Sequence, residues 1–268
     1  MPTEAKRLAA VPPAADDLPR MSLLAHLEEL RKRILYALLI ISAAFAPCWY
    51  YVQEIFTFLA APIQKLLPKG TKLAFLGVTD PFILYFKVAA LAAVFLAAPF
   101  LIYQLWSFIS PALYRKEKRF AIPFIFFGTV FFVSGGAFGY YVAFPNAVRF
   151  LLQMGQQFMP VITIERYAGF LLTVILGLGL MFEMPVVIFL AAWIGLIRPR
   201  TLMKYFRHAV VLIAIAAAIL TPTPDIVNMM VFMLPGIGLY LLGVGAAALV
   251  VRNKEKARAN EELEQGDE

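Results

Sequence analysis

The sequence has few charged residues and very few cysteines and histidines, and these scarcities exclude several classes of protein. Charged residues make up 15% of the 268 positions and hydrophobic residues 62%, against about 25% and about 45–50% in soluble domains. The only cysteine, Cys48, excludes an internal disulfide and a cysteine-based metal cage. His26 and His208 lie far apart in sequence, without metal-binding spacing. The composition therefore indicates a membrane protein, and we expect no metal or other cofactor.

Motifs for catalysis or nucleotide binding are also missing. The sequence contains no GxSxG, no Walker loop and no GxGxxG after a strand; GLG at 177–179 lies inside an apolar run and indicates helix packing. The net charge of +7 is typical of some nucleic-acid-binding proteins. Here, however, the basic residues cluster beside apolar runs, where they set topology and meet anionic lipid headgroups. We therefore expect neither an enzyme nor a nucleic-acid partner.

Six apolar runs predict six transmembrane helices. The fifth run has only 12 residues and covers about 18 Å, well under the roughly 30 Å of the hydrocarbon core. Prolines inside several runs predict kinks. Gly135 and Gly139 in the third run predict a face for close helix packing. The fold class is thus an all-α membrane protein with kinked helices and a short fifth span, and the predicted spans are 34–52, 82–105, 121–144, 168–191, 209–220 and 229–251.

The segments outside the spans have distinct compositions. Residues 22–34 carry leucine and isoleucine at helical spacing, which predicts an amphipathic helix at the membrane interface before the first span. Residues 55–67 read as an apolar helix in the first outer loop, broken by Pro62 and Pro68. The predicted organisation is a disordered cytoplasmic tail at 1–20, a transmembrane domain at 21–251 and a charged cytoplasmic tail at 252–268.

Lysine and arginine are distributed unequally between the two sides of the predicted bundle. Eighteen lie before the first span, in the connections at 115–119 and 198–207 and in the C-terminal tail, whereas the remaining loops hold five. Basic residues are retained on the cytoplasmic side of membrane proteins. We therefore expect both termini to lie in the cytoplasm.

Glu183 lies in a stretch, residues 167–197, that otherwise suits hydrocarbon. A charged carboxylate there costs roughly 2.5–3.5 kcal/mol on insertion scales, and protonation can relieve that cost. Such a residue is by default functional or critical for packing, and it faces protein or trapped water. In the alternative interpretation, a protonated Glu183 only hydrogen-bonds a neighbouring helix. Pro185 removes a backbone donor nearby, so the carbonyl of residue 181 is predicted to be a second polar group.

Two further carboxylates lie among basic residues beside predicted spans. Glu29 precedes Arg33 by four residues and Glu28 precedes Lys32 by four, so both can form i,i+4 ion pairs worth about 0.3–0.5 kcal/mol each. Glu117 lies inside RKEKR. Four neighbouring cations can neutralise it, or it can accept an incoming guanidinium. The pattern leaves both alternatives open.

Asp225 closes the TPTPD segment after the short fifth run, which draws it close to the outer interface. It can be an N-cap of the sixth helix, because aspartate accepts hydrogen bonds from the first turn. Alternatively, its charge serves a function at the outer surface.

Four segments carry a resemblance to a known family. Residues 26–33 read HLEELRKR, 103–119 YQLWSFISPALYRKEKR, 182–185 FEMP and 220–225 LTPTPD. They resemble the TatC family, the multi-spanning core of the twin-arginine protein translocase. The resemblance extends over nearly the whole chain. It implies a concave, glove-like helix bundle that acts as a receptor for signal peptides with paired arginines during export of folded proteins.

The resemblance also implies a location and partners. TatC-like proteins lie in the bacterial cytoplasmic (inner) membrane, in contact with its lipids, and assemble with TatA- and TatB-type single-span proteins. Self-association in the complex is expected, and the energy comes from the transmembrane proton gradient.

Site residues follow from the matched motifs. Glu29 and Glu117 match the family's two cytoplasmic carboxylates associated with twin-arginine recognition. Glu183 matches a polar point inside the concavity, and Asp225 matches an outer acidic position. Met229 is a departure, because some relatives carry glutamine there; Asn228 is adjacent. Four further residues match family positions where substitution impairs transport or recognition. They are Arg31, Arg33, Phe108 and, on the periplasmic side, Pro62.

A function from another class remains as the alternative. Glu183 could be the carrier site of a proton-coupled small-solute transporter. The single intramembrane carboxylate, the short fifth span and the lack of a visible repeat disfavour it.

Overall fold

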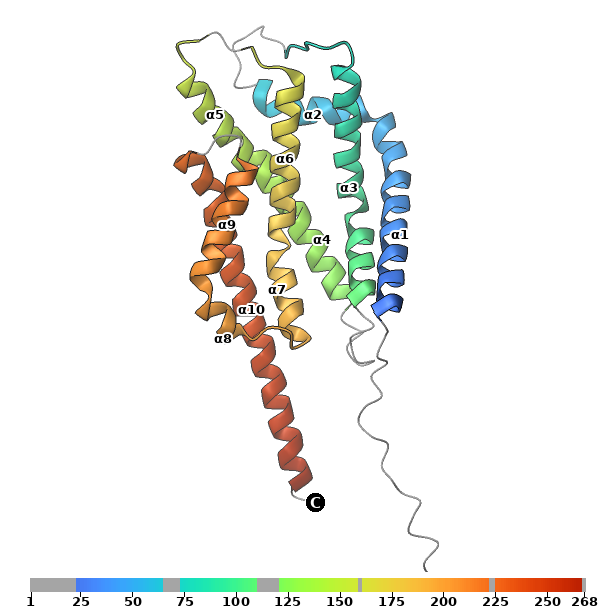
Figure 1. The fold of residues 1–268 in the computed structure, drawn as a ribbon, viewed down its shortest axis with the longest axis vertical. Coiled ribbons are helices and arrows are strands. Elements are labelled where there is room, and N and C mark those ends of the chain that lie inside the picture. The colour runs from blue at the N-terminus through green and yellow to red at the C-terminus, as the bar shows by residue number, and fades with distance from the viewer. Residues whose placement is uncertain (1–22, 65–72, 110–120, 159–160, 222–224, 267–268) are drawn as a thin grey trace, which may run out of the picture.

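The protein is described from a computed structural model that defines residues 23–64, 73–109, 121–158, 161–221 and 225–266 (Figure 1). Glu117 and the predicted tail at 1–20 lie outside these residues. The elements in chain order are α1 (Leu23–Tyr50), α2 (Val52–Gln64), α3 (Asp80–Ile109), α4 (Ala121–Phe138), the π-helical turn η3 (Gly139–Ala143), α5 (Phe144–Met154), α6 (Ile164–Phe182), α7 (Met184–Trp193), α8 (Pro199–Lys204), α9 (Phe206–Leu220) and α10 (Ile226–Gly266).

The chain runs back and forth along the long axis of the molecule (Figure 1). Five passes in the described residues are apolar helices of 24 to 34 residues, long enough to cross a membrane. The remaining pass, α9, has 15 residues and covers about 22 Å, less than the ~30 Å hydrocarbon core. The prediction of six spans with a short fifth is therefore confirmed, although α9 begins at Phe206 and not at 209.

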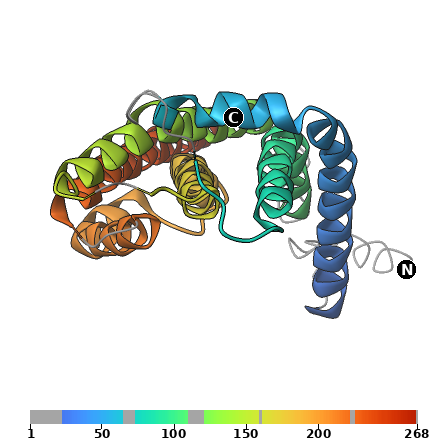
Figure 2. The same ribbon diagram turned by 90° about the horizontal axis from the view of Figure 1, so that it is seen from above.

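The two ends of the molecule differ. At one end, which we call the basic end, α1 and α4 begin and α3 and α7 end (Figure 1). At the opposite end, α2 lies crosswise. At that opposite end two connections are joined, because the Ala74 N–H donates to the Ile162 carbonyl at 3.0 Å and the Ile164 N–H donates to the Ala74 carbonyl at 2.8 Å. Seen from above, the helices form a curved row with α1 at one end and α9 near the other (Figure 2).

α1 is continuous from Leu23 to Tyr50. The sequence predicts a separate interfacial helix before the first span, whereas the structure places both segments in one helix. No glycine or proline lies between Leu23 and Ala46, so nothing interrupts the backbone hydrogen bonds there. Pro47 lies in the last turn, and the chain bends at Tyr51 into α2.

The fourth pass is broken at Glu183. α6 ends at Phe182 and α7 begins at Met184, with Pro185 in the first turn of α7. The Glu183 N–H donates to the Leu180 carbonyl at 3.1 Å, three residues back, which tightens the chain at the break. A helix break is thus found beside Pro185, with Glu183 as its central residue. The interruptions predicted at Pro99 and Pro235 are wrong, because α3 and α10 continue through these prolines.

Glycines let α4 approach α6 closely. An ideal Cβ added at Gly135 would lie 2.5 Å from the Leu178 carbonyl oxygen, and one added at Gly139 would lie 3.2 Å from the Ile175 Cα. No side chain fits at Gly135 without a shift of the α6 backbone. The packing face predicted from the spacing of these glycines is confirmed.

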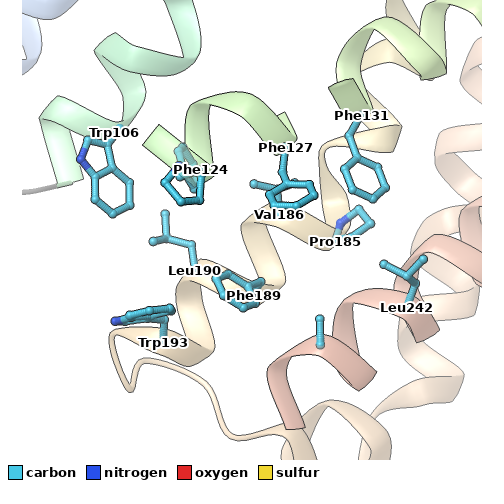
Figure 3. A pocket seen from close by; sticks show the side chains of 12 residues that line it. Trp106, Phe124, Phe127, Phe131, Pro185, Val186, Phe189, Leu190, Trp193 and Leu242 are labelled. Carbon is cyan, nitrogen blue, oxygen red and sulfur yellow. The ribbon is translucent and has the colours of Figure 1, made fainter. Parts of the chain in front are cut away.

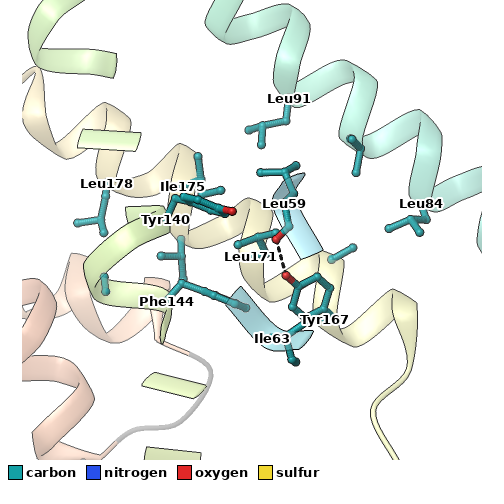
Figure 4. Packing of buried hydrophobic residues seen from close by; sticks show 14 of the residues in the cluster. Leu59, Ile63, Leu84, Leu91, Tyr140, Phe144, Tyr167, Leu171, Ile175 and Leu178 are labelled. Carbon is teal, nitrogen blue, oxygen red and sulfur yellow. Dashed lines mark hydrogen bonds between the residues drawn. The ribbon is translucent and has the colours of Figure 1, made fainter. Parts of the chain in front are cut away.

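Apolar side chains lie both inside and outside this bundle. Leu39, Ile122 and Leu212 are all more than 60% exposed, as expected for side chains that meet lipid. An apolar cavity of about 260 Å³ opens between α3, α4, α7 and α10 (Figure 3). The largest buried cluster lies towards the opposite end, where α2, α3, η3, α5 and α6 meet (Figure 4).

We predict that Gly135→Ala destabilises the protein, because its new Cβ would also lie 2.7 Å from the Phe182 Cβ. Overpacking of this kind typically costs about 1–3 kcal/mol of unfolding free energy, despite the better helix propensity of alanine. The measurement is thermal unfolding in detergent, followed by circular dichroism. Gly245→Ala on α10 is the control, since a Cβ there meets nothing within 4 Å. Equal melting temperatures for the two variants would contradict the close packing.

Candidate functional site

A polar contact joins α1 to α3 near the basic end. Arg33 donates to Glu29 Oε1 at 3.3 Å, and its other terminal nitrogen donates to Gln104 Oε1 at 3.2 Å. The Glu29–Arg33 pair is the i,i+4 pair expected from the spacing, with an added bond across helices. Glu28 and Lys32 are exposed, and no ion pair joins them in the described structure.

The second oxygen of Glu29 is the unusual feature of this contact. Glu29 Oε2 is buried and has no hydrogen-bond partner among the described residues, and the side chain as a whole is only 16% exposed. Buried polar atoms are nearly always hydrogen-bonded, and an unpaired one is costly. A carboxylate oxygen accepts only, so a donor from outside the described residues would satisfy it.

The other predicted residues of this region divide into two groups. Phe108 is half-buried and lies four residues after Gln104, so both are on the same side of α3 as the contact to Arg33. Arg31 is exposed and lies two positions from both Glu29 and Arg33, which places it on another side of α1. Glu117 lies outside the described residues. The structure therefore brings together Glu29 and Arg33, and Phe108 lies on the side of α3 that carries Gln104.

Gln104 was missed in the sequence, although it lies within the segment YQLWSF. One feature of the sequence points to Gln104: it places an amide inside a long apolar helix, where an unpaired polar side chain is costly. Its partner is 71 residues away, so spacing alone could not identify it.

Glu183 forms a second polar point, on different helices. Its Oε2 lies 3.5 Å from the position that a Cβ on Gly128 would take, and the Ile102 side chain borders the same space. Its Oε1 is buried without a hydrogen-bond partner in the described part of the chain. The neighbouring hydroxyl of Thr129 donates to the Ile125 carbonyl at 2.7 Å instead. In the described structure, Glu183 therefore forms none of the hydrogen bonds to a neighbouring helix that the alternative interpretation requires.

Pro62 has a structural consequence that the sequence did not predict. It does not break α2, which continues to Gln64, so the prediction of a break there is wrong. Because proline lacks an N–H, the Phe58 carbonyl four residues back loses its helical donor. The Tyr140 hydroxyl donates to that carbonyl from η3.

A second tyrosine, Tyr167, also forms a hydrogen bond to α2. The Tyr167 hydroxyl on α6 donates to the Leu59 carbonyl at 2.7 Å (Figure 4). The two hydroxyls satisfy carbonyls of α2 and hold this helix against η3 and α6. The proline therefore supplies an attachment point for α2.

Asp225 caps α10. Its Oδ1 accepts from the Asn228 backbone N–H at 2.7 Å, and its Oδ2 accepts from the Asn228 side-chain amide at 2.9 Å. Asn228 is 1% exposed, so its amide is committed to this contact and not to a surface. The N-cap interpretation is thus observed. Met229 is half-buried against the main core.

Comparisons with known proteins identify the family. The family described as Sec-independent protein translocase protein (TatC) matches residues 25–235. A TatC protein of Koribacter versatilis is 44% identical over 253 residues, with 93% of each chain covered. One of Helicobacter pylori is 39% identical over 226 residues, covering 84% of this chain and 88% of that protein.

A solved structure has the same fold. The crystal structure of a twin-arginine translocase receptor, TatC, superposes with a TM-score of 0.75 at 30% sequence identity, covering 84% of this chain and 99% of that one. Fold and sequence together define a multi-pass helical membrane protein that transports proteins and is not an enzyme. The chain belongs to the TatC family, the receptor subunit of the twin-arginine translocase, which exports folded proteins.

We predict that Asp225→Asn keeps the cap, whereas Asp225→Ala lowers the free energy of unfolding by about 0.5–2 kcal/mol. Asparagine retains an acceptor for the Asn228 N–H but carries no charge. The measurements are thermal unfolding in detergent and export of a folded cargo with a twin-arginine signal peptide. Normal export by Asp225→Asn would assign Asp225 to the cap. Lost export at normal protein level and stability would instead show that its charge has a function.

Proposed function

We propose that Glu29 and Glu117 accept the guanidinium groups of signal peptides that carry two adjacent arginines. The observation that supports this is the buried, unpartnered Oε2 of Glu29 at the basic end. A guanidinium donates along fixed parallel directions, and charge-assisted bonds to a carboxylate are about twice as strong as neutral ones. Glu117 is included in this proposal because it matches the family motif.

The electrostatics of the site favour selectivity over high affinity. Arg33 has its charge partly balanced by Glu29, while Arg31 and Lys32 are exposed next to it and repel a cationic peptide. Binding therefore depends on the geometry of the oxygen that Arg33 leaves unused. Lysine presents a point charge without the planar fork, so it satisfies this site less well.

We also propose that the basic end faces the cytoplasm, with both termini on that side. Support comes from the distribution of lysine and arginine, eighteen against five, which follows the positive-inside rule. In this orientation Glu29 lies where the charged region of a signal peptide remains while its apolar region enters the bilayer. Asp225 and α2 then lie on the periplasmic side, in the bacterial inner membrane.

Glu183 is proposed to bind a transmembrane partner. Its buried Oε1 lacks a partner in the described residues, and the cost of such a group in hydrocarbon favours contact with a polar atom from another helix. The partner is a TatA- or TatB-type single-span protein, another copy of this chain, or the passing signal peptide. Transport is driven by the proton gradient. Family membership favours this role over the alternative of a solute carrier site.

We predict that replacing both Glu29 and Glu117 by alanine weakens binding of a twin-arginine peptide by about 1–3 kcal/mol, the range for losing hydrogen bonds to charged groups. The measurement is a binding titration of a labelled signal peptide to the purified protein in nanodiscs. Glu28→Ala is the matched control, since Glu28 is an exposed carboxylate on the same helix. A double variant that binds as tightly as Glu28→Ala and discriminates equally against a twin-lysine peptide would disprove the assignment.

We predict different outcomes for two substitutions of Glu183. Glutamine keeps hydrogen-bonding capacity, so Glu183→Gln should retain most transport; Glu183→Ala should lose crosslinks to the partner's transmembrane helix. Transport assays and site-specific crosslinking measure the two effects. If glutamine is as inactive as alanine while crosslinks persist in both, protonation is the essential property and the binding account fails.

The orientation predicts which positions react with an impermeant thiol reagent. In a variant with Cys48 replaced by alanine, cysteines at Val78 and Phe158, 94% and 75% exposed at the opposite end, should be labelled in intact spheroplasts. A cysteine at Leu24, 79% exposed at the basic end, should be labelled only after permeabilisation. The reverse pattern would invert the proposed topology.

A further inference from the structure

The apolar cavity near the basic end is separate from both polar sites. We call it the aromatic slot, and the residues that line it are all apolar. Trp106 of α3 and Trp193 of α7 lie towards one end of the slot, and Phe131, Pro185 and Leu242 lie towards the other (Figure 3). Neither Glu29 nor Glu183 lines it.

The slot opens towards the surface that faces lipid. Phe127 and Leu242 line it and are 55% and 51% exposed. Trp106 lies three residues before the end of α3, and Trp193 is the last residue of α7, so the tryptophans mark the basic end. Tryptophan is enriched at the membrane–water interface. The slot therefore runs from one interface into the bilayer.

The size of the slot selects among apolar occupants. Its volume of about 260 Å³ is just below the ~300–1,000 Å³ of small-molecule sites. From Pro185 to Trp193 the wall is formed by nine residues of α7, and it is about 12 Å long. A helix with side chains is about 10–12 Å in diameter and does not fit within this volume. A single unbranched hydrocarbon chain does.

A positive charge lies at the end of the slot marked by Trp193. The Lys254 ammonium donates to the Trp193 carbonyl at 3.0 Å and lies 5.0 Å from the centre of its ring. These contacts hold the charge beside the slot. The segment 252–258 contains four basic residues and one acidic residue, and Arg198 and Arg200 follow Trp193 closely in sequence. Basic clusters next to a span attract anionic lipid headgroups.

We propose that the aromatic slot binds one acyl chain of an anionic phospholipid, whose phosphate lies at Lys254. The apolar lining takes the chain, and the ammonium together with the neighbouring basic residues selects an anionic headgroup over a zwitterionic one. The site holds a lipid at the junction of α4, α7 and α10, apart from the contact at Glu29. The proposal goes beyond the receptor function and does not depend on it.

The three tryptophans of the chain provide the test. Trp49 packs against Phe82 at the opposite end, so Trp49→Phe leaves only the two tryptophans of the slot. This variant is reconstituted in phosphatidylcholine vesicles in which a fixed fraction of lipid carries brominated acyl chains. Bromine quenches tryptophan fluorescence on contact. We expect brominated phosphatidylglycerol to compete for the slot about five times better than brominated phosphatidylcholine, the effect of one basic residue near the surface.

Substitutions separate the slot from general contact with lipid. In the Trp49→Phe background, Lys254→Gln should abolish the preference. Ala246→Phe should reduce quenching by both lipids, because Ala246 lines the slot. Ala248→Phe is the matched control on the exposed side of α10 and should change neither. Circular dichroism confirms that each variant is folded.

Other occupants give different results. Equal quenching by the two lipids, or a preference that survives both Lys254→Gln and Ala246→Phe, would overturn the proposal. Relief of quenching by a twin-arginine signal peptide would assign the slot to the peptide and would also overturn it. Because the readout is lipid contact without transport, its failure leaves the peptide-binding proposal unaffected.

Discussion

The close approach of α4 to α6 is the constraint on which the rest of the structure depends. Gly135 and Gly139 let the two backbones meet, and no side chain larger than hydrogen fits at Gly135. About two turns before Gly135, towards the basic end of α4, the same close approach places Gly128 beside the carboxylate of Glu183. Beyond the break at Glu183 the chain continues as α7, which packs on α4 through Phe124 and Leu190, and both helices line the aromatic slot. Tight packing, the polar point and the apolar slot are thus successive consequences of one helix pair.

Polar groups inside this apolar bundle are handled in two ways. Most are satisfied internally: Tyr140 and Tyr167 bond carbonyls of α2, and Arg33 bonds Gln104 across two helices. A proline inside a helix is tolerated when a side chain supplies the missing bond, and Pro62 of α2 with Tyr140 is an example. Glu29 and Glu183 differ, because each keeps one buried oxygen without a partner in the described residues. Such atoms are costly without a ligand, which supports binding at both positions.

The sequence predicts local features of this protein well and contacts between distant segments poorly. The spans follow from the length of the apolar runs, and the Glu29–Arg33 pair follows from four-residue spacing. Proline was a weaker guide, because the chain breaks beside Pro185 but α3 and α10 continue through Pro99 and Pro235. Pro62 was predicted to break α2, but the missing donor falls in the final turn, and Tyr140 compensates from far along the chain. The partnership of Arg33 with Gln104 and the placement of Gly128 beside Glu183 depend on helix packing, which a single sequence does not encode in its spacing. The resemblance suggested the role proposed for Glu29, and the structure added the oxygen that has no partner in the described residues.

The position of α1 gives the contact at Glu29 a further consequence. α1 stands at one end of the curved row, where only 6% of its membrane-spanning window is buried, and it packs mainly on α3 (Figure 2). Arg33 therefore has two tasks: it bonds Gln104 on α3, and it holds one oxygen of Glu29. A peptide guanidinium that used both oxygens of Glu29 would compete with Arg33 for Oε1, because a carboxylate binds one fork in bidentate fashion. A guanidinium that used Oε2 alone would leave the bond between α1 and α3 intact. Peptide binding and the attachment of α1 are linked through Arg33 in the first case and independent in the second.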